Sequence, residues 1–238
     1  MSTELNQTHT PLSTTLISVD VVPLRLAGGQ LQVLAGPARE SGAENCAVLP
    51  SGRIDPAHDQ TLEEAARRHL AALTQTAPRW LEQVETIGNN HRDSRGWSLT
   101  VVYMALLEHE QDAQNPQAQW RTLTPGQGAH DSAPFLAYDH NQLMWRAVER
   151  LRSKAQYTTL PLHLLPSTFT ITEIRNSLRS LLGQAPPLRS IRNRFLESGV
   201  IESTGHKRRG HNRPATLYRI SSEKKTRLFN RIYESTCK

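Results

Sequence analysis

Charge is distributed very unevenly along this chain of 238 residues. Residues 1–150 contain 11 Lys and Arg against 17 Asp and Glu, a formal charge of −6, whereas residues 151–238 contain 17 against 5, a formal charge of +12. Such a change indicates two domains, and the chain is long enough for each to bury a core. The basic part suits a polyanionic partner, of which nucleic acid is the first candidate. A basic surface that is merely solvated is the alternative.

The remaining composition excludes several protein classes. Cys46 and Cys237 are the only cysteines and are far apart, which favours neither a disulfide framework nor a thiolate zinc site. The longest mostly apolar run, residues 99–107, is far shorter than the roughly 20 residues that cross a bilayer. Residues 1–15 are polar and lack the pattern of a secretion signal, so we expect a flexible tail. These features predict a cytoplasmic protein without a membrane partner.

The acidic part has the pattern of an α+β domain. Two apolar, β-branched segments within residues 17–36 are separated by Gly28 and Gly29, which predicts a β-hairpin. Residues 61–76 are predicted to form a helix, because apolar residues recur there at three- and four-residue spacings. A second strand–loop–strand unit is expected over residues 81–109. Strands interleaved with an internal helix predict a mixed sheet.

The predicted helix carries an altered motif. The sequence LPSG followed by TLEEAARRHLAALTQT resembles the Nudix box, in which a glycine loop leads into a helix with glutamates at i, i+3 and i+4. Glutamates at this spacing share one helix face and can hold divalent cations against a diphosphate. With Arg68 aligned, the three glutamate positions hold His69, Ala72 and Leu73. Gln60 stands at a further glutamate position, and the glycine-to-helix spacing is longer than usual.

The resemblance implies a Nudix-like fold that keeps a pocket for a nucleoside diphosphate derivative without the usual hydrolysis. We predict no catalytic residue, no metal site and no cofactor. His69 is a conceivable replacement ligand, but one imidazole cannot neutralise magnesium as several carboxylates do. Glu63 and Glu64 lie one turn too early and are expected to favour the helix dipole instead.

Two cations and an aromatic ring lie close together in the segment GNNHRDSRGWSLTVVYMALL. Arg92 and Arg95, expected on a short loop, are suited to phosphate, and Trp97 is suited to stacking. The alternative is a tight turn in which the tryptophan anchors the next strand. The order of these motifs is similar to the NrtR family, Nudix-related transcriptional regulators of NAD metabolism. The resemblance implies an ADP-ribose-type effector, with Arg53, Arg92, Arg95 and Trp97 as effector-binding candidates, although Gly36–Ala47 departs from the usual arginine-bearing loop.

Another amphipathic helix is predicted over residues 139–157, with Asp139 as its N-cap. Its apolar residues form two adjoining stripes, which indicates contact with more than one partner. The stripes consist of Leu143, Ala147 and Leu151, and of Met144 and Val148. In the NrtR family the similar segment links the sensor to the DNA-binding domain. The matching residues are Leu136, Ala137, Tyr138, Asp139, His140, Arg150, Leu151, Arg152 and Lys154.

Two short helices are predicted in the basic part. Thr170 and Glu173 form a capping-box pattern and Gly183 is a stop signal, so the first helix lies between them. Its apolar face consists of Ile174, Leu178, Leu181 and Leu182. The second helix ends at Gly199, and its apolar side consists of Leu188, Ile191, Phe195 and Leu196. Its opposite side consists of Arg189, Arg192, Asn193 and Glu197. This is the pattern of a helix-turn-helix, whose second helix enters the major groove.

A basic loop and a strand at Thr216–Ile220 follow the second helix. Together they predict a hairpin, or wing, whose tip cations contact phosphates or the minor groove. A solvated charge run is the alternative. Residues 213–219 resemble the wing motif of the NrtR family, except that Asn212 stands where a glycine is usual. The predicted DNA-binding residues are Arg189, Arg192, Asn193, Arg194, Lys207, Arg208, Arg209 and Arg213.

These features predict an α+β protein, with an N-terminal Nudix-like mixed-sheet α/β/α domain followed by a C-terminal winged helix-turn-helix domain. The expected division is a tail at 1–15, a sensor at 16–138, a linking helix at 139–157 and a DNA-binding domain at 158–238. The resemblance implies a repressor of genes for NAD synthesis or salvage. We expect it to bind double-stranded DNA as a homodimer on a two-fold operator.

Two other functions compete with this prediction. A divergent Nudix pyrophosphatase acting on ADP-ribose or a similar compound would use substitute carboxylates. A nucleotide-binding protein could instead bind RNA through its basic tail. The helix-turn-helix pattern disfavours RNA, because the deep groove of an RNA duplex excludes helices.

Overall fold

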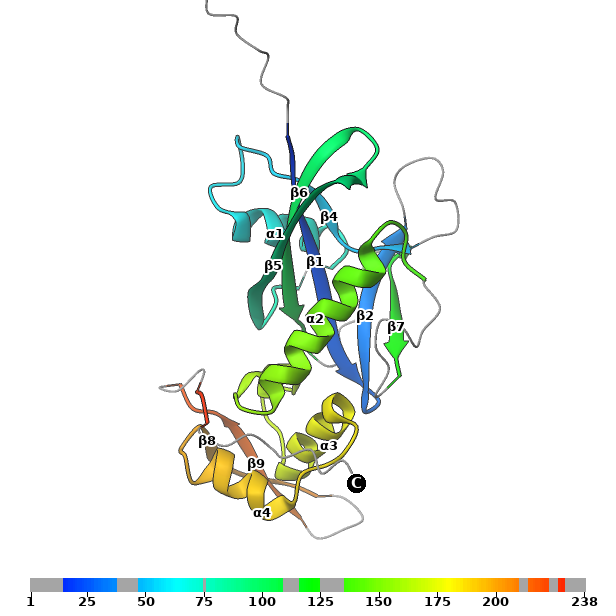
Figure 1. The fold of residues 1–238 in the computed structure, drawn as a ribbon. Coiled ribbons are helices and arrows are strands. Elements are labelled where there is room, and N and C mark those ends of the chain that lie inside the picture. The colour runs from blue at the N-terminus through cyan, green and yellow to red at the C-terminus, as the bar shows by residue number, and fades with distance from the viewer. Residues whose placement is uncertain are drawn as a thin grey trace, which may run out of the picture.

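The computed structural model describes residues 15–37, 47–74, 76–108, 116–124, 135–209, 214–222 and 227–229 (Figure 1). The strands of the larger sheet are β1 (Leu16–Ala27), β2 (Gln30–Pro37), β3 (Ala47–Val48), β4 (Ser51–Arg53), β5 (Trp80–Asp93), β6 (Gly96–Leu106) and β7 (Gln119–Leu123). A separate hairpin consists of β8 (Ile201–Arg208) and β9 (Ala215–Ile220). The helical segments are α1 (Leu62–Ala71), α2 (His140–Ala155), the 3-10 segment η1 (Leu160–Leu164), α3 (Ile171–Leu182), α4 (Leu188–Ile191) and the π-helical segment η2 (Arg192–Leu196).

The larger sheet is mixed, as predicted. β1 and β2 form the expected hairpin, in which Gly28 and Gly29 have φ angles of 57° and 75°. A two-residue turn requires this left-handed conformation, which glycine adopts without strain. β1 runs parallel to β6, whereas β5 pairs antiparallel with β6 at the edge of the sheet.

Two helices cover opposite faces of this sheet (Figure 1). Side chains alternate between the faces of a strand. Val19 and Val21 of β1 pack with α1, whereas Val22 and Leu24 of the same strand belong to the cluster that contains α2. The predicted α/β/α arrangement is therefore confirmed.

α1 ends earlier than predicted. Its N-cap is Thr61, whose hydroxyl accepts a hydrogen bond from the first turn, but the helix stops at Ala71 and does not continue to Thr76. The chain turns at this point, and Leu73 packs with Leu34 of β2. A tertiary contact therefore takes the place of the last predicted turn.

The capping signals of the first basic helix are confirmed. The Thr170 hydroxyl accepts from the Glu173 backbone nitrogen at 3.2 Å, and the Glu173 carboxylate accepts from the Thr170 backbone nitrogen at 2.7 Å. α3 starts directly after this capping box and ends at Gly183, whose φ of 78° is left-handed.

The second basic helix differs in geometry from the prediction. It is a regular α-helix only over Leu188–Ile191 and continues as the π-helical segment η2. A π turn changes the helical periodicity. Ile191 and Phe195 are buried, whereas Leu188 and Leu196 are 46% and 37% exposed. The prediction of one shared apolar side is therefore wrong for the two leucines.

The two parts of the chain share one core. A continuous cluster of buried side chains runs from the sheet through α2 to α3 and η2. At the boundary, the Arg79 guanidinium donates to the Leu165 carbonyl at 2.5 Å, and the Ser180 hydroxyl donates to the Gly29 carbonyl at 2.5 Å. α2 therefore contacts both the sheet and the basic helices, as its two apolar stripes predicted.

Some predictions concern residues outside the described part of the chain. These are residues 1–14 of the tail, residues 38–46, both cysteines, Asn212 and Arg213. Within the described part, no helix is long and apolar enough to cross a membrane.

Candidate functional site

A cavity of about 930 Å³ opens between α1, the β5–β6 turn and the N-terminus of α2. Sites for small molecules commonly have volumes of about 300–1,000 Å³. Three of the four predicted effector-binding residues, Arg53, Arg92 and Arg95, line this cavity. The fold therefore brings together three cations that are distributed over 43 positions of sequence from 53 to 95.

Trp97 is not among the described residues that line the cavity. It lies against Gly88 of the neighbouring strand, so closely that a Cβ atom at Gly88 would come within 2.7 Å of the indole ring. The Trp97 side chain is 46% exposed. This position fits the alternative interpretation, a tight turn in which the tryptophan anchors the next strand.

The altered Nudix motif faces the same cavity. His69 near the end of α1, and Ala72 and Leu73 just after it, form part of the cavity wall. The Nε2 atom of His69 lies 3.1 Å from the Arg53 carbonyl oxygen, which can only accept a hydrogen bond. Burial lowers the pKa of His69, so its imidazole is neutral at neutral pH and donates through Nε2–H.

The carboxylates of α1 stabilise the helix and its N-terminus. Glu63 pairs with Arg67 one turn later at 2.6 Å, on the exposed side. The Glu64 carboxylate accepts from the Gln60 backbone nitrogen at 2.6 Å, as part of the N-terminal cap. In the described part of the chain, no group of three or more His, Cys, Asp or Glu residues is placed to hold a metal ion.

Arg68, the residue used to align the motif, fixes the loop before α1. Its guanidinium donates to both oxygens of Asp59, at 2.8 and 2.5 Å, and to the Arg53 carbonyl at 3.1 Å. The hydrogen bonds from Arg68 hold the pKa of Asp59 well below its usual range. This pairing positions the Arg53 backbone at the cavity.

A buried ion-pair network joins three elements beside the cavity. The Arg92 guanidinium on β5 donates to Asp20 on β1 at 3.1 Å and to Asp139 before α2 at 2.5 and 3.0 Å. Asp20 also accepts from the Thr100 hydroxyl at 2.6 Å and lies 3.3 Å from His140 Nε2. Burial would raise the pKa of the Asp20 carboxyl, but these hydrogen bonds and the neighbouring guanidinium outweigh it and lower the pKa.

This network corrects two local predictions. Arg92 was expected on a loop, but β5 extends to Asp93 and includes it. Asp139 occupies the N-cap position of α2, but its side chain makes no capping hydrogen bond, because both of its oxygens bind Arg92. Asp20 was not predicted as a site residue. Its one sequence signal is a carboxylate within the apolar, β-branched run of β1.

Arg95 lies at the exposed edge of the cavity. Its guanidinium pairs with Asp93 at 2.7 Å, and its side chain is 54% exposed. The hydrogen bonds from Arg95 lower the pKa of Asp93 to about 2. A ligand that enters the cavity from solvent therefore meets a cation that is already paired but accessible.

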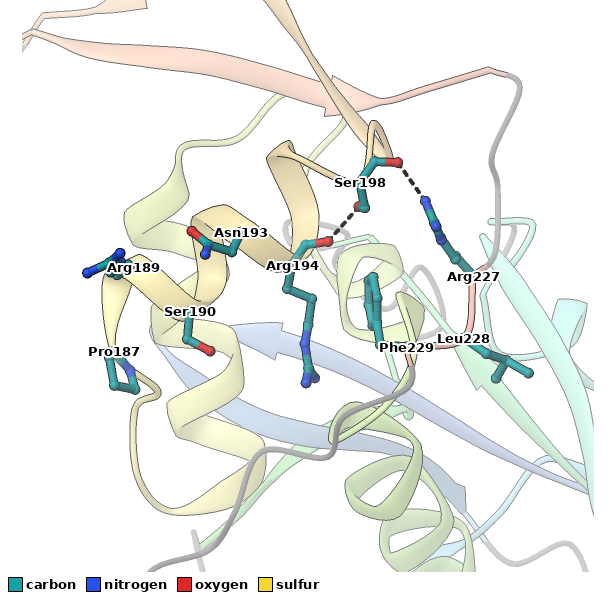
Figure 2. Close-up of a pocket in the computed structure, with 9 residues that line it drawn as sticks. All are labelled: Pro187, Arg189, Ser190, Asn193, Arg194, Ser198, Arg227, Leu228 and Phe229. Atoms are coloured by element: carbon teal, nitrogen blue, oxygen red, sulfur yellow. Dashed lines mark hydrogen bonds between the residues drawn. The ribbon is translucent and has the colours of Figure 1, made fainter.

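The predicted DNA-contacting residues of the second basic helix point in different directions. The exposed ones are Arg189, Arg192 and Asn193. Figure 2 shows the Arg194 side chain running toward the C-terminal segment. It donates to the Gln156 carbonyl at the end of α2, and its guanidinium lies 5.0 Å from the Phe229 ring centroid. These contacts make Arg194 a link within the protein, although it lines the same groove as Arg189 and Asn193.

Residues 227–229 reinforce this link. The Phe229 backbone nitrogen donates to the Tyr157 carbonyl at 2.7 Å. The Phe229 ring meets Phe195 edge-on, with centroids 5.5 Å apart. A groove of about 620 Å³ remains between this segment and the helix (Figure 2). The C-terminal segment therefore connects the end of α2 to the second basic helix.

The predicted wing is present, with a longer first strand than expected. Lys207 and Arg208 lie within β8 and pair with β9, so they precede the tip. Arg208 also forms an ion pair with Glu173 at 2.7 Å, which connects the wing to the N-terminus of α3. Lys207 and Arg209 are exposed.

The winged-helix part matches a known family. Residues 161–220 match the NrtR DNA-binding winged helix domain. The chain is also 36% identical over 223 residues to the ADPR responsive transcriptional repressor NtrR of Acinetobacter baylyi, covering 92% of this chain and 87% of that protein. This chain belongs to the NrtR family.

Solved NrtR structures have the same architecture. Shewanella oneidensis NrtR, complexed with a 27mer DNA, is 34% identical and matches with a TM-score of 0.82, covering 92% of this chain and 100% of that chain. The NUDIX domain of S. oneidensis NrtR, complexed with ADP ribose, is 35% identical with a TM-score of 0.50, covering 61% of this chain and 94% of that domain. The predicted NrtR fold, a Nudix-like domain followed by a winged helix, is confirmed.

Proposed function

We propose that this chain is a DNA-binding transcriptional repressor whose Nudix-like domain binds ADP-ribose or a related nucleotide without hydrolysing it. The observation that carries the proposal is the composition of the cavity wall. It contains Arg53, Arg92 and Arg95, and it contains His69, Ala72 and Leu73 at the positions that the resemblance aligns with the glutamates of the Nudix box. Guanidinium groups suit phosphate, whereas magnesium requires carboxylates. The S. oneidensis complexes with DNA and with ADP ribose support the two partners.

Each part of the chain has its own role in this function. Residues 16–138 form the sensor, residues 139–157 the linking helix and residues 158–238 the DNA-binding domain. Two chains act together as a cytoplasmic homodimer on a two-fold operator, because paired winged helices gain affinity and site length. The regulated genes are those for NAD synthesis or salvage.

A hydrolysis assay tests the sensor function against an enzymatic one. Full-length protein is incubated with ADP-ribose and related dinucleotides in the presence of magnesium, and binding is measured in parallel by calorimetry. We expect binding without turnover. Robust turnover that is abolished by substitution of His69 or Glu64 would instead identify a divergent Nudix pyrophosphatase.

Arg95→Ala is expected to weaken ADP-ribose binding by about 10- to 100-fold, because hydrogen bonds to charged groups contribute about 1.5–3 kcal/mol. The side chain is 54% exposed, so folding should be little affected. Calorimetric titration of the full chain gives the dissociation constant. Arg121→Ala is the control, because Arg121 is an exposed cation of β7 that does not line the cavity. Equal losses for both variants would contradict a phosphate contact at Arg95.

Substitutions in the basic part are expected to separate base contacts from phosphate contacts. Arg192→Ala or Asn193→Ala should reduce the preference for operator over random DNA, whereas Lys207→Ala should weaken both and lower the salt slope by about one. Fluorescence anisotropy over a salt series, with a fragment selected from genomic DNA by the protein, measures both quantities. Equal losses on both DNAs for all three variants would show that the second helix does not contact bases.

A further inference from the structure

Arg92 belongs both to the cavity and to the junction that precedes α2. Its guanidinium lines the cavity and bridges two carboxylates from separate elements. One is Asp20 on the central strand β1, at 3.1 Å, and the other is Asp139 at the N-cap position of α2, at 2.5 and 3.0 Å. The Arg92 side chain is 11% exposed and lines the cavity.

The two carboxylates are held with different strength. Asp20 is 3% exposed and is also bonded by Thr100 and His140. Asp139 is 22% exposed, and its carboxylate hydrogen bonds in the described structure go to Arg92. Arg92 holds Asp139 by two hydrogen bonds and Asp20 by one, but Asp139 is the carboxylate that can turn away from Arg92, because Asp20 is also fixed by Thr100 and His140.

The charges of the cavity wall make such competition necessary. The cations of the wall are Arg53, Arg92 and Arg95, and its carboxylates are Asp20, Asp93 and Asp139. The wall is therefore close to neutral. Arg92 is paired with Asp20 and Asp139, and Arg95 is paired with Asp93, so a phosphate that binds either guanidinium meets the negative charge of its partner. Binding becomes favourable when a carboxylate gives up its cation to the phosphate, because like charges at close range repel each other.

The start of α2 has an alternative arrangement available. Tyr138 has a φ of 58°, a left-handed conformation that is strained for a residue with a side chain, and it lines the cavity. Once released from Arg92, the Asp139 carboxylate can accept hydrogen bonds from the first backbone N–H groups of α2, as N-cap aspartates commonly do. Displacement of Asp139 therefore exchanges one set of hydrogen bonds for another at a strained junction.

The far end of α2 contacts the DNA-binding helices. The Gln156 carbonyl accepts from Arg194 of η2, and the Tyr157 carbonyl accepts from the Phe229 backbone, which packs on Phe195. The 16 residues of α2 form a rigid connection of about 24 Å between these two ends. α2 therefore connects Asp139 at its start to groups that contact the second basic helix at its end.

We propose that Arg92 is a positioning residue that exchanges partners when the effector binds. An anionic phosphate takes the guanidinium from Asp139, the carboxylate turns to the N-terminus of α2, and the helix shifts the DNA-binding domain. This inference rests on the proposed function and states how effector binding regulates DNA binding. The effector binds the exchanged arrangement more tightly than the original one, which is the condition for any ligand to shift such an equilibrium.

Asp139→Asn tests the exchange in the full-length chain. The dissociation constant for DNA selected by the wild-type protein is measured with and without saturating ADP-ribose, and ADP-ribose affinity is measured separately. For the wild type we expect ADP-ribose to change the DNA dissociation constant by about 5- to 150-fold, a typical coupling. Asp139→Asn should bind ADP-ribose at least as tightly as the wild type. The ratio of its DNA dissociation constants with and without ADP-ribose should fall below about twofold.

Asp93→Asn is the matched control. It removes the same charge from the same cavity and breaks the ion pair with Arg95, but Asp93 precedes the β5–β6 turn and its ion pair is with Arg95 and not with the Arg92 guanidinium that binds Asp139. It should tighten ADP-ribose binding and keep the wild-type ratio. Asp139→Ser can still cap the helix and should behave like Asp139→Asn. The same result for both variants would exclude a folding defect that is specific to one of them.

Hydrogen exchange of the α2 amides at residues 140–143 provides a second readout. ADP-ribose should change this exchange in the wild type and in Asp93→Asn, but not in Asp139→Asn. A wild-type ratio in Asp139→Asn, or an equal loss in Asp93→Asn, would overturn the inference and leave the proposed function standing. Failure of the wild type to bind ADP-ribose or DNA would overturn the proposed function, and the inference with it.

Discussion

Replacing Asp20 by alanine is expected to lower the free energy of unfolding by about 3–5 kcal/mol, the cost of breaking a buried ion pair by removing one partner. Asp20 is 3% exposed, pairs with Arg92 at 3.1 Å and accepts from Thr100 at 2.6 Å. Without the carboxylate, the buried guanidinium loses one of its two counter-charges. Whole proteins are stable by only about 5–15 kcal/mol, so urea unfolding followed by circular dichroism should show a large fall in midpoint.

Glu63→Ala is the control for this prediction. Glu63 also pairs with an arginine, Arg67 at 2.6 Å, but the two side chains are 52% and 45% exposed. Exposed ion pairs contribute about 0–1 kcal/mol, so a small loss is expected. Comparable losses for the two variants would show that the buried network contributes no more than a surface pair.

The same carboxylate predicts a pH dependence. Folding lowers the pKa of Asp20 below its ordinary value of 3.8. Its contribution to stability is therefore fully present above pH 3.8 and is lost as the pH falls through the lower pKa of the folded state. Asp20→Asn should have a flatter stability profile than the wild type below pH 3.8. Parallel acid unfolding curves would contradict a charged Asp20 in the folded protein.

Phe195→Ala is expected to lower the free energy of unfolding by about 3–5 kcal/mol, the usual cost of a cavity left by a buried aromatic ring. The Phe195 side chain is fully buried and packs against Phe229 and the shared core. Because this core joins α2 to the basic helices, DNA affinity should fall as well. Chemical unfolding and DNA binding of the same variant measure the two effects.

Leu196→Ala is the neighbouring control. The sequence pattern places Phe195 and Leu196 on one apolar side, but Leu196 is 37% exposed. Removing a side chain that is already partly in water leaves a smaller cavity, so its loss of stability should be well below that of Phe195→Ala. Equal losses would indicate that the π-helical turn at η2 does not separate the two residues.

The candidate effector site was predictable in part. The resemblance to the Nudix box, aligned on Arg68, places His69, Ala72 and Leu73 at the glutamate positions of that motif, and all three line the cavity. Arg53, Arg92 and Arg95 were predicted from residue type and from resemblance, and they also line it. Trp97 was not separable from them by sequence, because its packing on Gly88 depends on the register of β5 and β6.

The sequence by itself determined the features that depend on neighbouring residues. The capping box at Thr170, the hairpin turn at Gly28 and Gly29 and the basic helix-turn-helix pattern all follow from contacts within a few positions of the chain. Propensities and spacing act over the same short range, so the capping box and the hairpin turn formed as predicted, whereas the second basic helix formed at the predicted place with a different geometry.

Only the tertiary structure decided which charged groups meet. Arg92 reaches Asp139 and Asp20 across 47 and 72 positions of sequence, and Arg194 turns inward to Gln156 across 38. An arginine in a basic helix has the same local pattern whether it faces DNA or the protein. Its partner depends on strand register, on the π turn and on the return of the C-terminal segment, which the packing of the whole chain sets.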